Sequence, residues 1–149
     1  MISETVPSGL KLNESLPVSE FGESYEGYYS GIKAVRKVIT EKAGQVTGAF
    51  NHKELGDIDV VWGKVTDAKK HKGFGLSHIL DKHPTFDVNL IPEIIKNGTF
   101  DNPKKKDLKK MQNINIKYKN YKLGIRNGYN VDNKKVRSNR WIVTSYEED

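Results

Sequence analysis

Apolar residues recur every three or four positions in three stretches of the chain, residues 31–43, 76–83 and 90–96. This spacing places them on one side of a helix, so it predicts three amphipathic helices. Gly44, Pro84 and the pair Asn97-Gly98 follow these stretches and are typical helix stops. Each predicted helix is short, and packing against other elements must therefore hold it in place.

Alternation of apolar and polar residues predicts strands elsewhere in the chain. The predicted strands are residues 45–52, 57–64, 114–119, 121–126 and 141–146. Residues 53–56 and the pair Lys119-Asn120 are short enough to be hairpin turns, whereas the polar, basic residues 65–72 and 127–140 are predicted loops. Strands that follow helices and are joined by tight turns indicate an α+β fold, with short helices packed on one face of a twisted antiparallel β-sheet.

The length and composition favour a single domain that folds without disulfides or structural metal ions. The chain of 149 residues is long enough to bury a core, and it has no cysteine, which excludes disulfides and thiolate metal sites. Residues 1–30 show no sustained period, so we expect a loosely ordered lead-in or linker before one domain at residues 31–149. No stretch has the features of a membrane span or a signal peptide, and we expect a soluble chain.

The charge of the chain points to a polyanionic partner. The formal net charge is +6, the isoelectric point is near 9.3, and the basic residues concentrate in the C-terminal half, including the run at residues 104–110. Such residues supply contacts to phosphates that do not depend on sequence. A nucleic acid is therefore the first partner to consider, although mild basicity also serves solubility alone.

Two of the four histidines, His78 and His83, stand on the predicted helix at residues 76–83, with Lys82 between them. The helical wheel places His83 at the rim of the core, and His78 with Lys82 on the opposite, wetter side. The helix dipole stabilises a cationic His83, which suits a proton donor near neutral pH. Alternatively, His83 satisfies backbone carbonyls at the helix end. For His78, an acid/base group, a phosphate contact and a solvated residue all remain open.

Hydroxyl and cationic side chains accompany the predicted C-terminal strands. Strict alternation gives the last strand two faces, with Ile142, Thr144 and Tyr146 on one and Trp141, Val143 and Ser145 on the other. Arg126 and Lys122 project from the neighbouring strand. Threonine is common in strands for its β-propensity alone, but beside an arginine and a histidine its hydroxyl can bind a phosphoryl oxygen.

Asp57 and Asp59 raise the alternative of a metal site. Two aspartates at positions i and i+2 of a strand share a face, which is how nucleotidyltransferases present carboxylates to Mg²⁺. That architecture needs a Gly-Ser turn opening a helix shortly upstream, and the sequence has none. Structural hydrogen bonding by these aspartates is favoured, and no metal or other cofactor is predicted.

Three segments, residues 56–63, 75–83 and 140–147, resemble the phage-associated barnase/EndoU/colicin/RelE-like (BECR-fold) nucleases both in their order and in their amino-acid sequence. The resemblance extends over residues 47–147. It implies a small ribonuclease fold in which a helix and a sheet meet across a substrate cleft. It also implies that His83 and His78 are acid/base groups, that Thr144 supplies a hydroxyl and that Arg126 is a transition-state cation.

Domains of this family occur in phage-borne proteins and as C-terminal toxin modules of bacterial competition systems. The resemblance therefore implies delivery as part of a larger secreted or phage-borne protein and action in the cytoplasm of a target bacterial cell. It further implies an immunity protein or antitoxin as partner, and an acidic partner would be suited to cover the basic cleft.

These features lead to the hypothesis of a metal-independent endoribonuclease toxin that cleaves RNA, with transfer RNA as one candidate, through attack by the 2′-hydroxyl. Its predicted substrate contacts are Lys82, Lys122, Arg140, Ser145 and Tyr146. The alternative is a non-catalytic RNA-binding or interaction module in which the histidines are structural. A third interpretation is a metal-dependent enzyme built on Asp57 and Asp59.

Overall fold

The computed structural model describes residues 23–25, 29–101, 108, 110–131 and 134–148, and of residues 129–131 and 134–138 only the backbone. Its helices are α2 (Gly31–Glu41), α3 (Gly75–Lys82) and α4 (Ile91–Asn97), with a short 3-10 helix, η2 (Val88–Leu90), before α4. Its strands are β1 (Gln45–His52), β2 (Gly56–Val61), β3 (Lys64–Asp67), β4 (Lys72–Phe74), β5 (Thr99–Phe100), β6 (Asn113–Tyr118), β7 (Tyr121–Val131) and β8 (Lys134–Glu147). The three predicted helices are confirmed to within two residues at each end.

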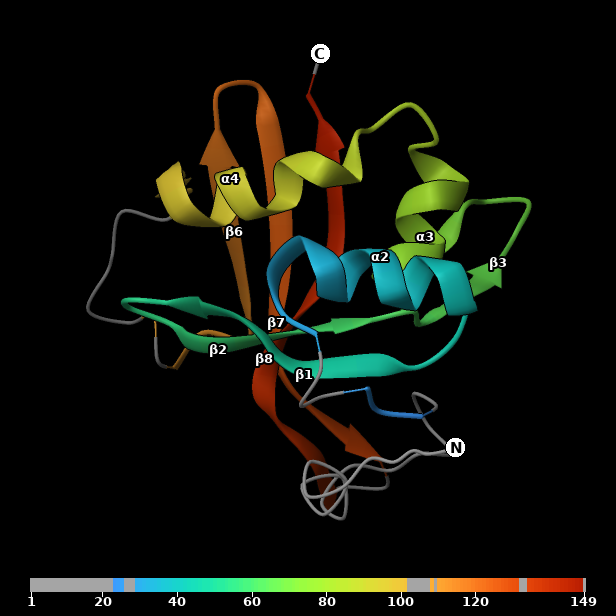
Figure 1. Cartoon of the computed structure of the whole chain (residues 1–149), viewed down its shortest axis with the longest axis horizontal. Coiled ribbons are helices and arrows are strands. Elements are labelled where there is room, and N and C mark those ends of the chain that lie inside the picture. Colours follow the sequence, from blue (N-terminus) through green and yellow to red (C-terminus); the bar gives the residue numbers. More distant parts are fainter. Residues whose placement is uncertain (1–22, 26–28, 102–107, 109, 132–133, 149) are drawn as a thin grey trace.

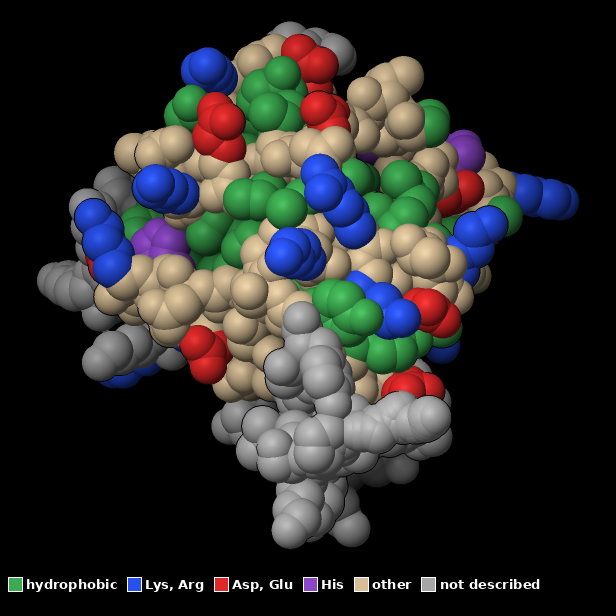
Figure 2. Space-filling model, viewed as in Figure 1, with side chains coloured by type: hydrophobic (Ala, Val, Ile, Leu, Met, Phe, Trp, Pro, Cys, Tyr) green, Lys and Arg blue, Asp and Glu red, His purple; other side chains and the backbone are tan. Residues whose placement is uncertain are grey.

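Six strands form one sheet in the order β1-β2-β8-β7-β6-β5. Neighbouring strands are antiparallel except β2 and β8, which run parallel. Figure 1 shows α2 and α4 across one face of this sheet, and α3 at its side next to the separate hairpin of β3 and β4. In the same view, Figure 2 shows apolar side chains between scattered Lys and Arg side chains over these helices. The predicted α+β class is confirmed.

The apolar stripes of the helices form the core, as their spacing predicted. The helices bury Ala34, Val35, Val38, Leu76, Ile79, Ile91, Ile94 and Ile95 in one cluster with sheet residues that include Ile58, Ile116, Leu123 and Ile142. Burying one Val, Leu or Ile side chain contributes roughly 1.5–3 kcal/mol, so this cluster is the main source of stability. A smaller cluster joins Val61 and Trp141, with Phe74 and Val143 packed against them.

A bulge in β8 changes which of its side chains share a face of the sheet. Residues paired across antiparallel strands share a face. Leu123 pairs with Ser145 and Ile125 with Ile142, all buried. Gly124 pairs with Thr144, and the register shifts between Gly124 and Ile125. The predicted grouping of Ile142 with Thr144 and Tyr146 is therefore wrong, as is that of Ser145 with Trp141, because the shift interrupts the alternation.

The two predicted loops contain strands. Residues 65–72 include parts of β3 and β4, which pair as a small antiparallel hairpin. Residues 127–140 belong to β7 and β8 apart from residues 132–133, which lie outside the described residues, so a long hairpin replaces the expected loop. Sequence reasoning missed these strands because polar residues on both faces leave no apolar alternation to detect.

Most of the predicted lead-in and of the basic run lies outside the described residues. Before residue 29 only residues 23–25 are described, and Ser24 forms an isolated parallel bridge with Gln45 of β1. Of residues 104–110, only Leu108 and Lys110 are described, and Leu108 is buried in the core. Among the described residues, no helix has the length and apolarity to cross a membrane.

Candidate active site

The face of the sheet opposite α2 and α4 gathers polar side chains from β6, β7 and β8, and we call it the second face. The register places three rows across these strands: Lys117, Lys122 and Tyr146; Asn115, Gly124 and Thr144; and Asn113, Arg126 and Trp141. Successive rows are about 7 Å apart, since a strand rises about 3.4 Å per residue. Four of the predicted site residues, Lys122, Arg126, Thr144 and Tyr146, therefore share this face.

Helix α3 brings His83 onto this face. His83 is the residue that caps the C-terminus of α3, and its backbone N–H donates to the carbonyl of Ile79 at 2.8 Å. Its ring stacks on that of Tyr146, with 4.7 Å between the ring centroids and an angle of 21° between the planes. The end of the helix and the last strand thus meet where the sequence predicted that they would.

His78 lies behind His83. The two rings meet edge to face with their centroids 6.1 Å apart, and His78 is only 7 % exposed. The prediction that His78 occupies a wetter side was wrong, because β3, β4 and β8 all pack against the short helix α3. Its Nδ1 is buried and has no hydrogen-bond partner among the described residues.

The surroundings of the two imidazoles favour their neutral forms. Burial lowers the pKa of His78, and the nearby charge of Lys82 lowers it further. Burial also lowers the pKa of His83, with additional contributions from His78 and Lys82. The expected stabilisation of a cationic His83 by the helix end is therefore outweighed. A neutral imidazole can accept a proton, which is the chemistry of a general base.

Thr144 and the cations complete the second face. The hydroxyl of Thr144 is buried and has no hydrogen-bond partner among the described residues. Lys122 pairs with Asp101 at 3.4 Å, and its neighbour Lys117 pairs with Glu148 at 3.2 Å. Arg126 is exposed. Sequence reasoning did not select Lys117 or its carboxylate partner for the site, and the strand register is the signal that places Lys117 there.

Two predicted contact residues point elsewhere. Ser145 is fully buried, and its hydroxyl donates to the backbone carbonyl of Lys122 at 2.9 Å. The guanidinium of Arg140 donates to the carbonyls of Leu55 at 2.9 Å and Leu108 at 3.1 Å, and burial lowers its pKa. Both side chains connect segments of backbone, and the structure does not bring them together with His83.

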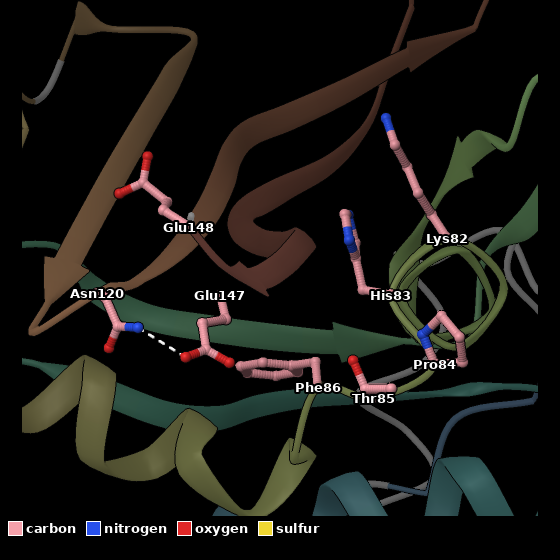
Figure 3. A pocket seen from close by; sticks show the side chains of 8 residues that line it. All are labelled: Lys82, His83, Pro84, Thr85, Phe86, Asn120, Glu147 and Glu148. Carbon is pink, nitrogen blue, oxygen red and sulfur yellow. Dashed lines mark hydrogen bonds between the residues drawn. The ribbon is translucent and has the colours of Figure 1, made fainter.

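A hollow of about 530 Å³ opens beside His83 at the end of the sheet. Figure 3 shows Lys82 and His83 on one side of it and Asn120, Glu147 and Glu148 on the other. The amide of Asn120 donates to Glu147 at 2.6 Å. Because carboxylates line the far side, a phosphate is better accommodated on the cationic second face.

The two aspartates considered as metal ligands make structural hydrogen bonds. The carboxylate of Asp59 is fully buried and accepts from the backbone N–H of Gly48 at 2.8 Å and from the amide of Asn139 at 3.1 Å. Asp57 accepts from the amide of Asn51 at 2.9 Å. Within the described part of the chain, no group of three or more acidic or histidine side chains is arranged to hold a metal ion.

Comparison with known families identifies the class of protein. A family model described as phage-Barnase-EndoU-ColicinE5/D-RelE like nuclease1 matches residues 49–149. Because the match covers more than half of the chain, this protein belongs to that family of nucleases, and the resemblance seen in the sequence is confirmed. No curated protein and no solved structure gives a significant match to the chain.

Proposed function

We propose that this nuclease is a metal-independent endoribonuclease that uses the 2′-hydroxyl of RNA as its nucleophile. The observation that carries the proposal is the stacking of His83 on Tyr146, beside His78 and on the face that holds Lys122 and Thr144. This arrangement provides proton transfer and phosphate binding within one small region. Membership of a nuclease family supports a phosphodiester as the substrate.

In the proposed reaction, one imidazole removes the proton of the 2′-hydroxyl, and the 2′-oxygen attacks the adjacent phosphorus. The bond from phosphorus to the 5′-oxygen breaks, and that oxygen receives a proton from a second group. The products are a 2′,3′-cyclic phosphate and a 5′-hydroxyl. We assign His83 to one proton transfer because its ring reaches the second face, where it stacks on Tyr146, and His78, which lies behind it, is the candidate for the other.

Cations and a hydroxyl stabilise the charge that develops on the phosphorus. Lys122 can exchange its exposed partner Asp101 for a phosphate, since an exposed ion pair of this kind is worth little in water. Arg126, exposed two rows away, and Lys82 add positive charge. The hydroxyl of Thr144, which has no hydrogen-bond partner in the described part of the chain, can donate to a phosphoryl oxygen once its side chain rotates.

Purified protein incubated with total cellular RNA in EDTA tests this proposal. We expect cleavage, fragment ends that carry 2′,3′-cyclic phosphate, and resistance of an RNA with a 2′-deoxy substitution at the cleavage position. His83→Ala should abolish cleavage while its circular dichroism spectrum matches the wild type. A strict requirement for Mg²⁺, or DNA cut as readily as RNA, contradicts the proposal, because DNA has no 2′-hydroxyl.

The rival function is a non-catalytic RNA-binding or interaction module. The burial of His78 and the stacking of His83 favour it, since both contacts are also what structural histidines make. Retention of RNA without cutting, unchanged by His83→Ala, would establish this rival.

We further propose that the domain acts as a toxin in the cytoplasm of a bacterial cell, where an immunity protein or antitoxin neutralises it. Membership of a phage-associated nuclease family supports a nucleic acid as the target of the toxin. The net charge of +6 supports an acidic protein as the neutralising partner. Induced expression in a bacterium tests this. Growth should stop with the wild type and continue with His83→Ala, and equal growth in both cultures would contradict the toxin role.

A further inference from the structure

The hairpin of β3 and β4, residues 64–74, carries a cluster of exposed lysines, and we call it the basic hairpin. Its lysines are Lys64, Lys69, Lys70 and Lys72, all exposed. Among the described residues, none of them has an ion-pair partner within 4.0 Å. Figure 2 shows Lys and Arg side chains projecting from the edge of the molecule where Figure 1 draws β3.

The one acidic residue of the basic hairpin is committed to its turn. Asp67 accepts from the backbone N–H groups of Lys69 at 3.1 Å and Lys70 at 3.2 Å. Four lysines and one aspartate leave three formal positive charges on a segment of eleven residues. The nearby field is therefore positive, and the side-chain ammonium groups are free to bind an anion.

The basic hairpin is fixed to the helix that carries the histidines. Helix α3 packs against both β3 and β4. A side chain at Gly63 would collide with the backbone of Phe74 and one at Gly73 with the carbonyl of Lys64, so glycine at both positions lets the two strands approach closely. His71 near the tip of the hairpin contacts Asp81 of α3 at 3.0 Å. Asp81 belongs to the last turn of α3, so the tip of the hairpin lies beside the end of the helix that His83 caps.

We propose that the basic hairpin is a second RNA-binding element, which binds backbone phosphates next to the one that is cleaved. The inference rests on the proposed ribonuclease function. Phosphate contacts of this kind add affinity without sequence preference and make binding depend on salt. Because the hairpin is already folded, with its strands packed on α3 and its turn closed by Asp67, it can bind these phosphates without first ordering a loop.

The consequence is a dependence on RNA length. A dinucleotide has only the phosphate at His83, whereas a longer RNA also reaches the basic hairpin. The wild-type enzyme should therefore have a higher kcat/KM for a 20-mer than for a dinucleotide, and the difference should shrink as salt is raised.

The test compares two quadruple variants with the same net charge. The first carries K64Q, K69Q, K70Q and K72Q. The control carries K33Q, K42Q, K53Q and K96Q, which are equally exposed but lie on α2, after α2, in the turn from β1 to β2 and on α4. Should the hairpin variant fold poorly, the pairs K64Q/K72Q and K69Q/K70Q replace it.

We expect the hairpin variant to lose about tenfold or more in kcat/KM for the 20-mer and to stay within about twofold of wild type for the dinucleotide. The slope of log affinity against log salt for the 20-mer should fall by roughly two to three, as expected when three or four phosphate contacts are lost. The control variant should lose much less on both measures.

Equal losses in the two variants would overturn the inference, because bulk charge would then explain the effect. An unchanged 20-mer reaction would also overturn it, including the case in which the hairpin instead binds an acidic protein. A wild type that binds the 20-mer but cuts no RNA contradicts the proposed function alone, since anisotropy measurements of binding still test the hairpin.

Discussion

At the scale of single residues, the proposed reaction depends on how the surroundings of His83 set its proton affinity. Burial, His78 and Lys82 all lower its pKa. When His83 is the proton acceptor of the proposed reaction, it must be neutral, and activity then falls as pH drops through this pKa. The acidic limb of the pH–rate profile therefore reports the local charge around α3.

Replacing Lys82 by glutamine should move this limb to higher pH. The substitution removes one of the positive charges that lower the pKa of His83, and we expect a shift of a few tenths of a unit because the side chain is exposed and its charge is screened. The matched control is Lys96→Gln, the basic residue in the last turn of α4. A limb that stays in place in Lys82→Gln, or moves equally in the control, contradicts the explanation.

His52 makes the stability of the folded protein depend on pH. Burial lowers its pKa below the ordinary value of 6.5, and its Nδ1 accepts from the backbone N–H groups of Glu54 at 3.0 Å and Leu55 at 3.2 Å. The folded state therefore binds fewer protons than the unfolded state between the two pKa values, so stability rises with pH there. The stabilisation is complete above 6.5 and is lost as pH falls below it.

His52→Asn should reduce this loss, because the amide oxygen can accept the same two hydrogen bonds and does not titrate in this range. Urea unfolding at pH 7 and pH 5 gives the comparison. The wild-type midpoint should fall more between these values than that of the variant, while the two differ by less than about 1 kcal/mol at pH 7. Equal falls would show that His52 is not a source of the pH dependence.

The position of His83 could be predicted from sequence because helical spacing and Pro84 together fix where the helix ends. The burial of His78 could not, since a wheel assumes that one side of a helix is covered. Here β3, β4 and β8 cover more than one side of α3, and two of these contacts come from a hairpin whose polar sequence resembled a loop.

At the scale of elements, β8 determines which hydroxyl lies on the second face. Thr144 lies on the second face with Tyr146, and Ser145 lies in the core with Leu123, as the alternation of residues 144–146 predicted. Alternation failed only across Val143, where the bulge places Ile142 on the core side with Ser145 and Trp141 on the second face, because a bulge inserts one residue without an obvious sequence signal. Adjacent residues of one strand consequently have different expected roles.

Ser145→Ala and Thr144→Val should have opposite effects. Ser145→Ala removes a buried hydrogen bond to the carbonyl of Lys122, and we expect a loss of about 1 kcal/mol with little change in cleavage per folded molecule. Thr144→Val removes a hydroxyl that has no partner among the described residues, so stability should hold or rise, whereas cleavage should fall by about tenfold or more. Urea unfolding and RNA cleavage rates measure the two effects, and a larger cleavage loss in Ser145→Ala would refute the assignment of faces.

At the scale of the whole molecule, the helices and their stripes could be predicted because each buries one apolar side in a single core. The parallel pairing of β2 with β8 could not, since it joins segments about eighty residues apart through two described pairs, Ile58 with Arg140 and Asp59 with Trp141. That pairing connects the β1–β2 hairpin to the strand that holds Thr144. Strands β1 and β2 therefore hold β8 in place, whereas the side chains of the second face come from β6, β7 and β8.

The extent of the folding unit follows from the same packing. The family match begins at residue 49, inside β1, and leaves α2 outside it. Yet Ala34, Val35 and Val38 of α2 are fully buried in the core. At roughly 1.5–3 kcal/mol for each buried valine, the two valines alone contribute about 3–6 kcal/mol, a large fraction of the stability of a typical domain, about 5–15 kcal/mol.

A chain that begins at residue 49 should therefore fail to fold, whereas one that begins at residue 23 keeps every described element and should unfold cooperatively. Circular dichroism and urea unfolding distinguish them. The longer chain also keeps two backbone hydrogen bonds that hold the start of the edge strand β1. In these bonds Tyr25 donates to Gln45 at 2.8 Å and Gln45 donates to Glu23 at 2.9 Å. If the chain from residue 49 folded with wild-type stability, α2 would be an accessory to the nuclease domain and the packing argument would fail.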